Sequence, residues 1–218
     1  MTELEAMSVF RTKGRSVIAL ILLGVLLVAG GVPAQAGDEE FGAEAKAFVE
    51  DMAVKAIAEL TVSDLDKDKR RRRFREMMHE YFAFKGIAKW VLGRYWRRAT
   101  EVERKEYLEL FEQLMVAVYT ERFERYSGET LSVERAEVRG GKDVLVHSRL
   151  LRPNGLKPIK VAWRVRADGH VYRVVDILVE GLSMGVTQRE EFASFIRQNN
   201  GKVQSLLIEL RKRIEAAT

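Results

Sequence analysis

Three histidines, His79, His147 and His170, are the side chains best suited to metal binding or to proton transfer near neutral pH. None of them lies at ligand spacing from another histidine or from a carboxylate, and the chain has no cysteine, so a zinc or thiolate site is not indicated. The sequence also contains no Gly-x-Ser-x-Gly turn and no glycine-rich phosphate loop. We therefore expect no metal, no cofactor and no enzymatic activity.

Asp176 and Glu180 are the carboxylates set in a strongly apolar stretch, VYRVVDILVE. On a strand they would share one face and stand about 13 Å apart. An acid/base pair is one interpretation of these two residues. A structural role near the end of the strand is the interpretation we favour.

The segment KWVLGRYWRRAT, residues 89–100, places aromatic rings beside guanidinium groups. Such a mixture could stack on nucleic-acid bases, lie at a lipid headgroup layer, or pack a helical corner. We favour packing, with Arg94 holding the corner and with Arg97 or Arg98 in solvent. The rings expected in the corner are Trp90, Tyr95 and Trp96. A contact of Arg97 and Arg98 with a membrane surface or a transporter is the alternative.

A second basic segment, DKDKRRRRFRE, carries the arginine run Arg70 to Arg73. On a helix each residue turns by about 100°, so these side chains spread round nearly the whole circumference. We expect a solvated helix face, and a contact with anionic headgroups or with an acidic partner is the alternative. The formal net charge of +5 is small beside 37 basic and 32 acidic residues and indicates little beyond solubility.

The N-terminus has the features of a secretory signal peptide. Basic residues between positions 11 and 15 precede the apolar run VIALILLGVLLVAGGV, which ends at a proline and the small-x-small motif AQA. Because this run is shorter than the roughly 20 residues of a membrane-spanning helix, we favour cleavage after Ala36 over retention as an anchor. The predicted organisation is a signal peptide at residues 1–36 and one domain at residues 37–218. Export without cysteines indicates a bacterial periplasm, where no nucleic-acid partner is expected.

Apolar residues recur at spacings of three and four in the first half of the chain, which predicts helices. These helices are expected at residues 41–60, about 65–81 and about 86–92. A longer helix should open at a capping box formed by Thr100 and Glu103 and end before Gly128. Two further helices are expected at about residues 186–198 and 201–216.

From Leu131 the apolar period changes to two, which predicts strands at residues 131–138, 144–151, 159–166 and 171–180. Gly-Gly, Pro-Asn-Gly and Asp-Gly turns separate them, so the strands should form an antiparallel meander. The predicted fold class is α+β: an antiparallel four-stranded curved meander sheet packed against a helical N-terminal half and C-terminal helices.

Two segments carry a family resemblance. They are FAFKGIAKWVLGRYWRRATEVERKEYLELFEQLMVAVY, residues 82–119, and YRVVDILVEGLSM, residues 172–184. Together they resemble the MlaC-type periplasmic phospholipid-binding proteins, also called the toluene-tolerance family of ABC-transporter auxiliary components. This chain departs from the family's usual pattern at Ala83, where Asp is frequent, and at Glu101, where Pro is frequent.

The resemblance implies a periplasmic carrier of phospholipid, expected to be a monomer. Its implied partners are an outer-membrane lipid-transfer complex and an inner-membrane ABC transporter complex with a lipid-binding periplasmic domain, which together maintain outer-membrane lipid asymmetry. A carrier of the hopanoid-linked branch, a carrier of another hydrophobic ligand, and an exported partner-binding protein without ligand are the alternatives. An exported enzyme with a pocket is disfavoured by the missing catalytic residues.

Water imposes a physical requirement on such a carrier. Exposing two acyl chains of about 15 methylenes each costs on the order of 24 kcal/mol, so the chains must be sheathed in an apolar cavity. We expect the helices and the curved sheet to enclose that cavity. The residues expected to touch the chains come from the short helix, the long helix and the inward strand faces: Trp90, Val91, Leu92, Met115, Tyr119, Val146, Val161, Trp163 and Val165.

Overall fold

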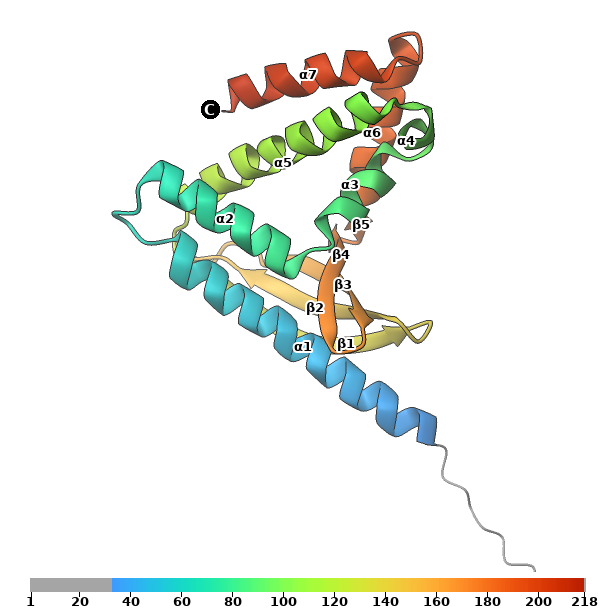
Figure 1. Cartoon of the computed structure of the whole chain (residues 1–218). Helices are drawn as coiled ribbons and strands as arrows, with labels where there is room; N and C mark the ends of the chain where they lie inside the picture. Colours follow the sequence, from blue (N-terminus) through green and yellow to red (C-terminus); the bar gives the residue numbers. More distant parts are fainter. Residues whose placement is uncertain (1–32, 218) are drawn as a thin grey trace, which may run out of the picture. The chain divides into compact units, whose positions relative to one another are not determined.

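The computed structural model describes residues 33–217, which form seven helices and one antiparallel sheet of five strands (Figure 1). This is the α+β class that the sequence predicts. Residues 1–32, which hold most of the expected signal peptide, lie outside the described residues. Within residues 33–217, no helix combines the length and the apolar character that crossing a membrane requires.

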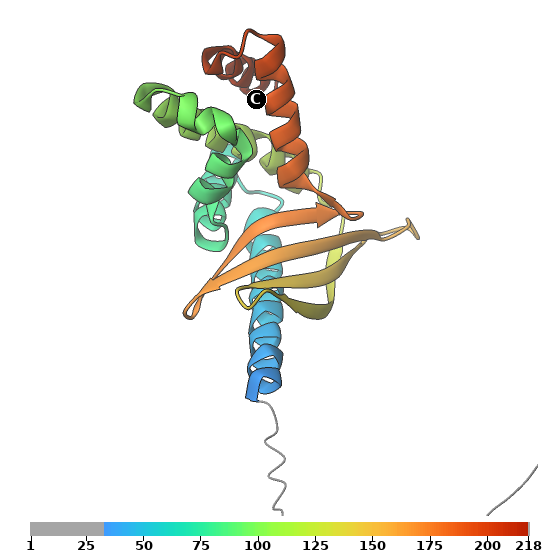
Figure 2. The ribbon, with the colours of Figure 1, turned by 90° about the vertical axis from the view of Figure 1, so that its right-hand side faces the viewer.

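The first helix, α1 (Pro33–Leu60), begins earlier than the predicted start at Phe41. Proline suits the first turn of a helix, because its missing N–H would have no partner there. The motif expected to precede the cleavage point therefore belongs to the same helix. One side of α1, with Ala45, Val49 and Met52, is buried against the sheet, and Figure 2 shows α1 running across the direction of the strands.

The arginine run lies in α2 (Lys67–Tyr81). Two of its guanidinium groups donate hydrogen bonds to backbone carbonyls at the end of α1. Arg70 is only 7% exposed, and its Nε donates to the carbonyl of Leu60 at 2.9 Å. Nη1 of Arg73 donates to the carbonyl of Glu59 at 2.9 Å. These bonds satisfy carbonyls that the last turn of a helix leaves without partners. The prediction of a solvated face is therefore wrong at Arg70 and Arg73.

The aromatic and basic segment forms α3 (Phe84–Leu92), a tight turn at Gly93, and the short α4 (Arg94–Arg98). Gly93 has a φ of 59°, which side chains disfavour, and a Cβ built on it would lie 3.0 Å from Nε of Arg189. The turn therefore requires glycine, and it allows α3 and α4 to meet at a corner.

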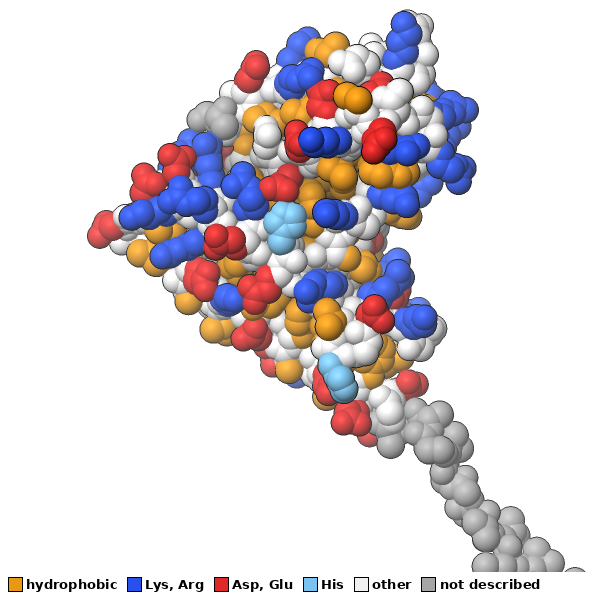
Figure 3. Space-filling model, viewed as in Figure 1, with side chains coloured by type: hydrophobic (Ala, Val, Ile, Leu, Met, Phe, Trp, Pro, Cys, Tyr) orange, Lys and Arg blue, Asp and Glu red, His pale blue; other side chains and the backbone are white. Residues whose placement is uncertain are grey.

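The corner is packed around Tyr95, which is 1% exposed and accepts a hydrogen bond from Nη2 of Arg94 at 3.1 Å. Trp96 is half-buried against the neighbouring helices. All three arginines of the corner, Arg94, Arg97 and Arg98, are exposed, and Figure 3 shows basic side chains gathered around α4. Trp90 is 43% exposed, so the prediction that it packs inside the corner is wrong. It lies on the side of α3 that faces solvent and Arg189.

The long helix α5 (Glu101–Glu124) begins at the predicted capping box. Oγ1 of Thr100 accepts from the backbone N–H of Glu103 at 3.2 Å, and Oε2 of Glu103 accepts from the backbone N–H of Thr100 at 2.8 Å. Two helices follow the sheet: α6 (Met184–Gln198) packs against α3, and α7 (Val203–Ala216) packs against α5.

The sheet is a meander in which each strand pairs with the next along the chain. Its strands are β1 (Thr130–Arg139), β2 (Asp143–Leu151), β3 (Ile159–Asp168), β4 (Val171–Val179) and β5 (Leu182–Ser183). The first four correspond to the predicted strands, whereas β5 is not predicted. Glu180 and Gly181, with φ of 50° and 84°, form the two-residue hairpin that returns the chain from β4 to β5. With only two residues, β5 is too short to show a period in the sequence.

Buried apolar side chains form two separate cores. The helical core is built from α3 to α7 together with Met78 of α2, and it includes Tyr107, Phe111 and Leu207. The sheet core lies where α1 and α2 cover the strands and includes Val49 and Val165. The half-buried Phe74 of α2 packs against both cores.

Candidate functional site

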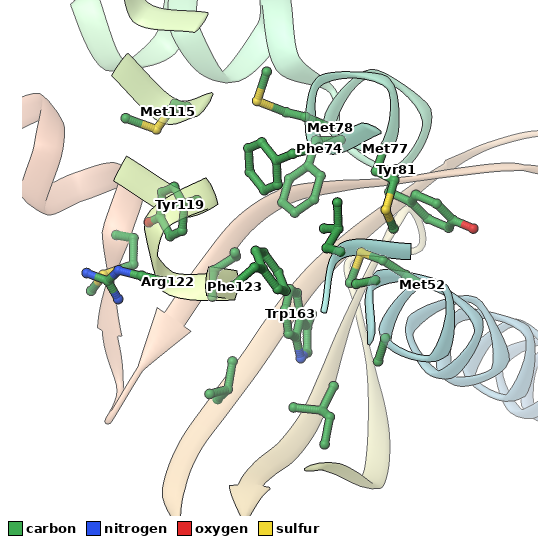
Figure 4. Close-up of a pocket in the computed structure, with 18 of the residues that line it drawn as sticks. Met52, Phe74, Met77, Met78, Tyr81, Met115, Tyr119, Arg122, Phe123 and Trp163 are labelled. Carbon is green, nitrogen blue, oxygen red and sulfur yellow. The ribbon is translucent and has the colours of Figure 1, made fainter. Parts of the chain in front are cut away.

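A cavity of about 660 Å³ lies between the helical core and the sheet core. Its walls come from α1, α2, α3, α5, the first four strands and the start of α6. Most of the side chains that line it are methionine, phenylalanine, leucine, isoleucine and valine. Figure 4 shows that the labelled side chains of the facing elements gather around this space.

The helical wall of the cavity follows from the spacing of apolar residues on α2 and α5. On α2 the lining residues are Phe74, Met77, Met78 and Tyr81, and on α5 they include Phe111, Met115, Tyr119 and Phe123. Spacings of three and four place each set on one helix face. The two sets meet where the Phe74 ring stacks on Tyr119, with centroids 6.2 Å apart, and packs against Phe123 at 6.0 Å.

The sheet wall uses only one end of an apolar strand face. Along β3, alternate residues share that face, and Val165 at one end is fully buried in the sheet core beneath α1. Ile159, Val161 and Trp163 continue the same face and line the cavity. One end of this strand face therefore packs in the sheet core with α1, and the other end lines the cavity.

Polar groups in this wall are satisfied within it. Nε1 of Trp163 donates to Oγ of Ser148 at 3.0 Å, and that hydroxyl donates to the carbonyl of Val161 at 2.9 Å. Ser148 is 3% exposed. Because these donors have partners in the protein, the wall presents apolar surface to the cavity rather than groups that require water.

Asp176 and Glu180 have structural partners. Oδ1 of Asp176 accepts from the backbone N–H of Ile177 and of Gly185, and Oδ2 accepts from the Ser183 hydroxyl at 2.6 Å. Oε1 of Glu180 accepts from the backbone N–H of Lys160 at 2.9 Å. These bonds secure the turn from β4 into α6, as the favoured structural interpretation predicts. Across residues 33–217, no group of three or more His, Asp or Glu side chains is placed to hold a metal ion.

Five of the nine residues predicted to touch lipid line the cavity: Val91, Met115, Tyr119, Val161 and Trp163. The other four lie elsewhere. Leu92 is 2% exposed in the helical core, because it follows Val91 by about 100° around α3. Trp90 stacks instead with Arg189 on the outer surface, 5.1 Å from the ring centroid to Cζ.

Val146 and Val165 are also placed away from the cavity. Both are 0% exposed in the sheet core. They lie on the predicted inward face, but at the end of it that α1 covers. Their prediction as lining residues fails because alternation along a strand identifies a face and not the part of that face that stays uncovered.

Sequence reasoning missed the contribution of α1 and α2 to the cavity. The missed residues include Met52, Ala56, Phe74, Met77, Met78 and Tyr81. The stripe on α2 is visible in the sequence as an amphipathic face. An apolar stripe that faces a cavity has the same spacing as one that faces a filled core, so no local signal separates the two.

Three comparisons place this fold among known proteins. The family model described as MlaC protein matches residues 50–212. The toluene tolerance protein ttg2D of Pseudomonas putida is 23% identical over 123 residues. That match covers 56% of this chain and 57% of the relative, so the chain spans a little over half the length of that relative.

A solved structure shares the fold. It is the phospholipid-binding protein from Ralstonia solanacearum, determined in complex with a phospholipid. The TM-score is 0.67 at 22% sequence identity, and the superposition covers 79% of this chain and 98% of that chain. The arrangement of helices around a meander sheet is therefore common to both proteins.

Proposed function

Because the chain belongs to the MlaC protein family, we propose that it is a periplasmic protein that binds phospholipid and carries it through water. The observation that carries this proposal is the apolar cavity of about 660 Å³ between the two cores. The family membership agrees with the resemblance of the two sequence segments. The solved relative from Ralstonia solanacearum, which contains a phospholipid, supports the same ligand class.

The cavity meets the physical requirement for such a ligand. Each methylene moved from water into apolar surroundings gains about 0.8 kcal/mol, so the acyl chains favour the space between Phe74, Met115 and Trp163. A largely apolar wall whose Trp163 and Ser148 donors are already paired does not favour a filling of ordered water. The phosphate and the rest of the headgroup stay hydrated at the cavity mouth.

Transport between membranes is the finer part of the proposal. The signal peptide predicted at residues 1–36 would direct the domain at residues 37–218 to the periplasm. There the protein would exchange phospholipid with an outer-membrane lipid-transfer complex and with an inner-membrane ABC transporter complex. We propose that it does so as a monomer, because elements of one chain supply every wall of the cavity described above.

Solvent extraction tests the ligand directly. The protein would be expressed with its N-terminal segment, recovered from the periplasm, and extracted for lipid mass spectrometry, with an unrelated periplasmic protein of similar size as the control. We expect phospholipid in near-stoichiometric amount. Hopanoid without phospholipid would favour the hopanoid-linked alternative. An extract without any lipid, together with failure to take up added phospholipid, would refute the carrier.

A further inference from the structure

Three charged side chains lie where the apolar lining of the cavity ends. Arg122, Glu129 and Arg152 are all lining residues, and each lies at the end of a helix or strand or directly beside it. Arg122 stands in the last turn of α5, and Figure 4 shows it at the margin of the labelled side chains, next to Tyr119. We refer to Arg122, Glu129 and Arg152 as the charged rim.

The strand register brings Glu129 and Arg152 together. In the pairing of β1 with β2, Thr130 lies opposite Leu151 and Leu131 lies opposite Leu150. The same register continued by one residue places Glu129 opposite Arg152. Because side chains alternate along a strand, Glu129 and Arg152 share the face of Leu131 and Leu150, both of which line the cavity.

The three charged side chains differ in how many of their hydrogen-bonding groups already have partners within the protein. Among the described residues, the side chain of Arg122 makes no hydrogen bond or ion pair, and its guanidinium lies over the Tyr119 ring at 5.3 Å from the centroid. Nε and Nη2 of Arg152 donate to the carbonyl of Lys157, which leaves Nη1 for a ligand. Both arginines can therefore donate further hydrogen bonds toward an anion at the mouth.

Glu129 supplies the opposite charge. Its carboxylate accepts from the backbone N–H of Ser127 at 2.9 Å and from the Ser127 hydroxyl at 3.0 Å, and these bonds hold it in place. The backbone bond is the main cause that lowers the pKa of Glu129, and the charge of Arg152 adds to it. The group is therefore ionised at neutral pH and repels a second negative charge.

We propose that the charged rim binds the headgroup of a zwitterionic glycerophospholipid, with the phosphate against Arg122 and Arg152 and the ammonium group against Glu129. This rests on the proposed function, because tails inside the cavity bring the glycerol phosphate to the rim. Two cations and one anion match a phosphate beside an ammonium group. An anionic headgroup without the ammonium group leaves Glu129 unmatched and repelled.

A competition between three lipids with identical acyl chains tests the proposal. Delipidated protein would be offered equal amounts of phosphatidylethanolamine, phosphatidylglycerol and diacylglycerol, and the bound species counted by native mass spectrometry. The variants are the double substitution Arg122→Gln with Arg152→Gln, and Glu129→Gln. The matched controls are Arg97→Gln and Glu190→Gln, which change exposed residues that do not line the cavity.

Because the rim is open to solvent, each contact is weakened by screening, and we expect preferences of about three- to tenfold. Wild-type protein should prefer phosphatidylethanolamine to diacylglycerol by that factor, and the double variant should lose the preference while keeping its total lipid. Glu129→Gln should raise the share of phosphatidylglycerol about threefold, and the controls should match wild type.

Two results would overturn the headgroup site and leave the carrier intact: a double variant with the wild-type preference, or a wild-type protein that takes phosphatidylglycerol or diacylglycerol as readily as phosphatidylethanolamine. A wild-type protein that binds none of the three lipids would overturn the proposed function together with the headgroup site.

Discussion

The substitution Val161→Trp tests whether the cavity beside β3 holds a ligand. Val161 lines the cavity, and an indole in its place adds about seven heavy atoms to a volume that acyl chain would otherwise fill. If these atoms displace as many methylenes at about 0.8 kcal/mol each, the binding free energy falls by about 6 kcal/mol at most. Partial rearrangement of the tails would halve this loss. We therefore expect lipid binding to weaken by about 10²- to 10⁴-fold.

The same substitution at Val165 should act on folding instead. Val165 shares the strand face of Val161 but is 0% exposed in the sheet core. A tryptophan there overpacks a filled interior and should cost about 1–3 kcal/mol or more of unfolding free energy. Val161→Trp enters open space and should change that free energy by less than about 1 kcal/mol. Val102→Trp, at a site that is 75% exposed, is the surface control for both.

Two measurements separate these effects. Native mass spectrometry would give the lipid occupancy of each purified variant, and urea unfolding of the delipidated proteins would give the stability. A folded Val161→Trp protein with the lipid occupancy of wild type and of Val102→Trp would refute the assignment of this cavity to the ligand. A Val165→Trp protein as stable as wild type would refute the conclusion that Val165 packs in a filled core while Val161 faces the cavity.

Three further predictions test the framework that holds the cavity. Arg70→Met should lower the unfolding free energy by about 2–4 kcal/mol, because it removes the bonds to the end of α1 and the ion pair with Glu124 at 3.3 Å. Exposed Arg72→Met should change it by less than about 0.5 kcal/mol, and equal effects in urea unfolding would contradict the anchoring role. Gly185→Ala should cost about 1–3 kcal/mol, because the new Cβ would lie 2.8 Å from Cζ3 of Trp90 and 3.1 Å from Oδ1 of Asp176. Gly86→Ala, in the open on α3, should instead stabilise by about 0.5–1 kcal/mol, and thermal melts in which both variants shift the same way would argue against this packing. Burial, assisted by the hydrogen bond to Glu44, raises the pKa of Tyr172 to about 12. The folded state then holds this proton more tightly than the unfolded chain, so the contribution is complete below pH 10 and is lost as the pH rises from about 10 to 12. Tyr172→Phe should therefore show a shallower loss of urea resistance over that interval, and parallel declines of variant and wild type would count against it.

Much of the local structure of this protein is determined by the sequence alone. The capping box at Thr100 and Glu103, the turn at Gly93 after α3 and the four long strands are all recognisable from residue type and period. The two segments that carry the family resemblance can likewise be recognised from the sequence alone. Spacing also identified the correct strand face, on which Val161, Trp163 and Val165 all lie.

Tertiary structure alone decided what those faces contact. Whether Val165 packs in a core while Val161 faces a cavity depends on where α1 stops covering the strands, and α1 is distant in sequence from both. Arg70 became a buried anchor because the end of α1 happens to present its free carbonyls to α2. A hydrophobic period records only that a side chain avoids water. The same period therefore arises whether the apolar side chain packs against another side chain in a core or lines an apolar cavity.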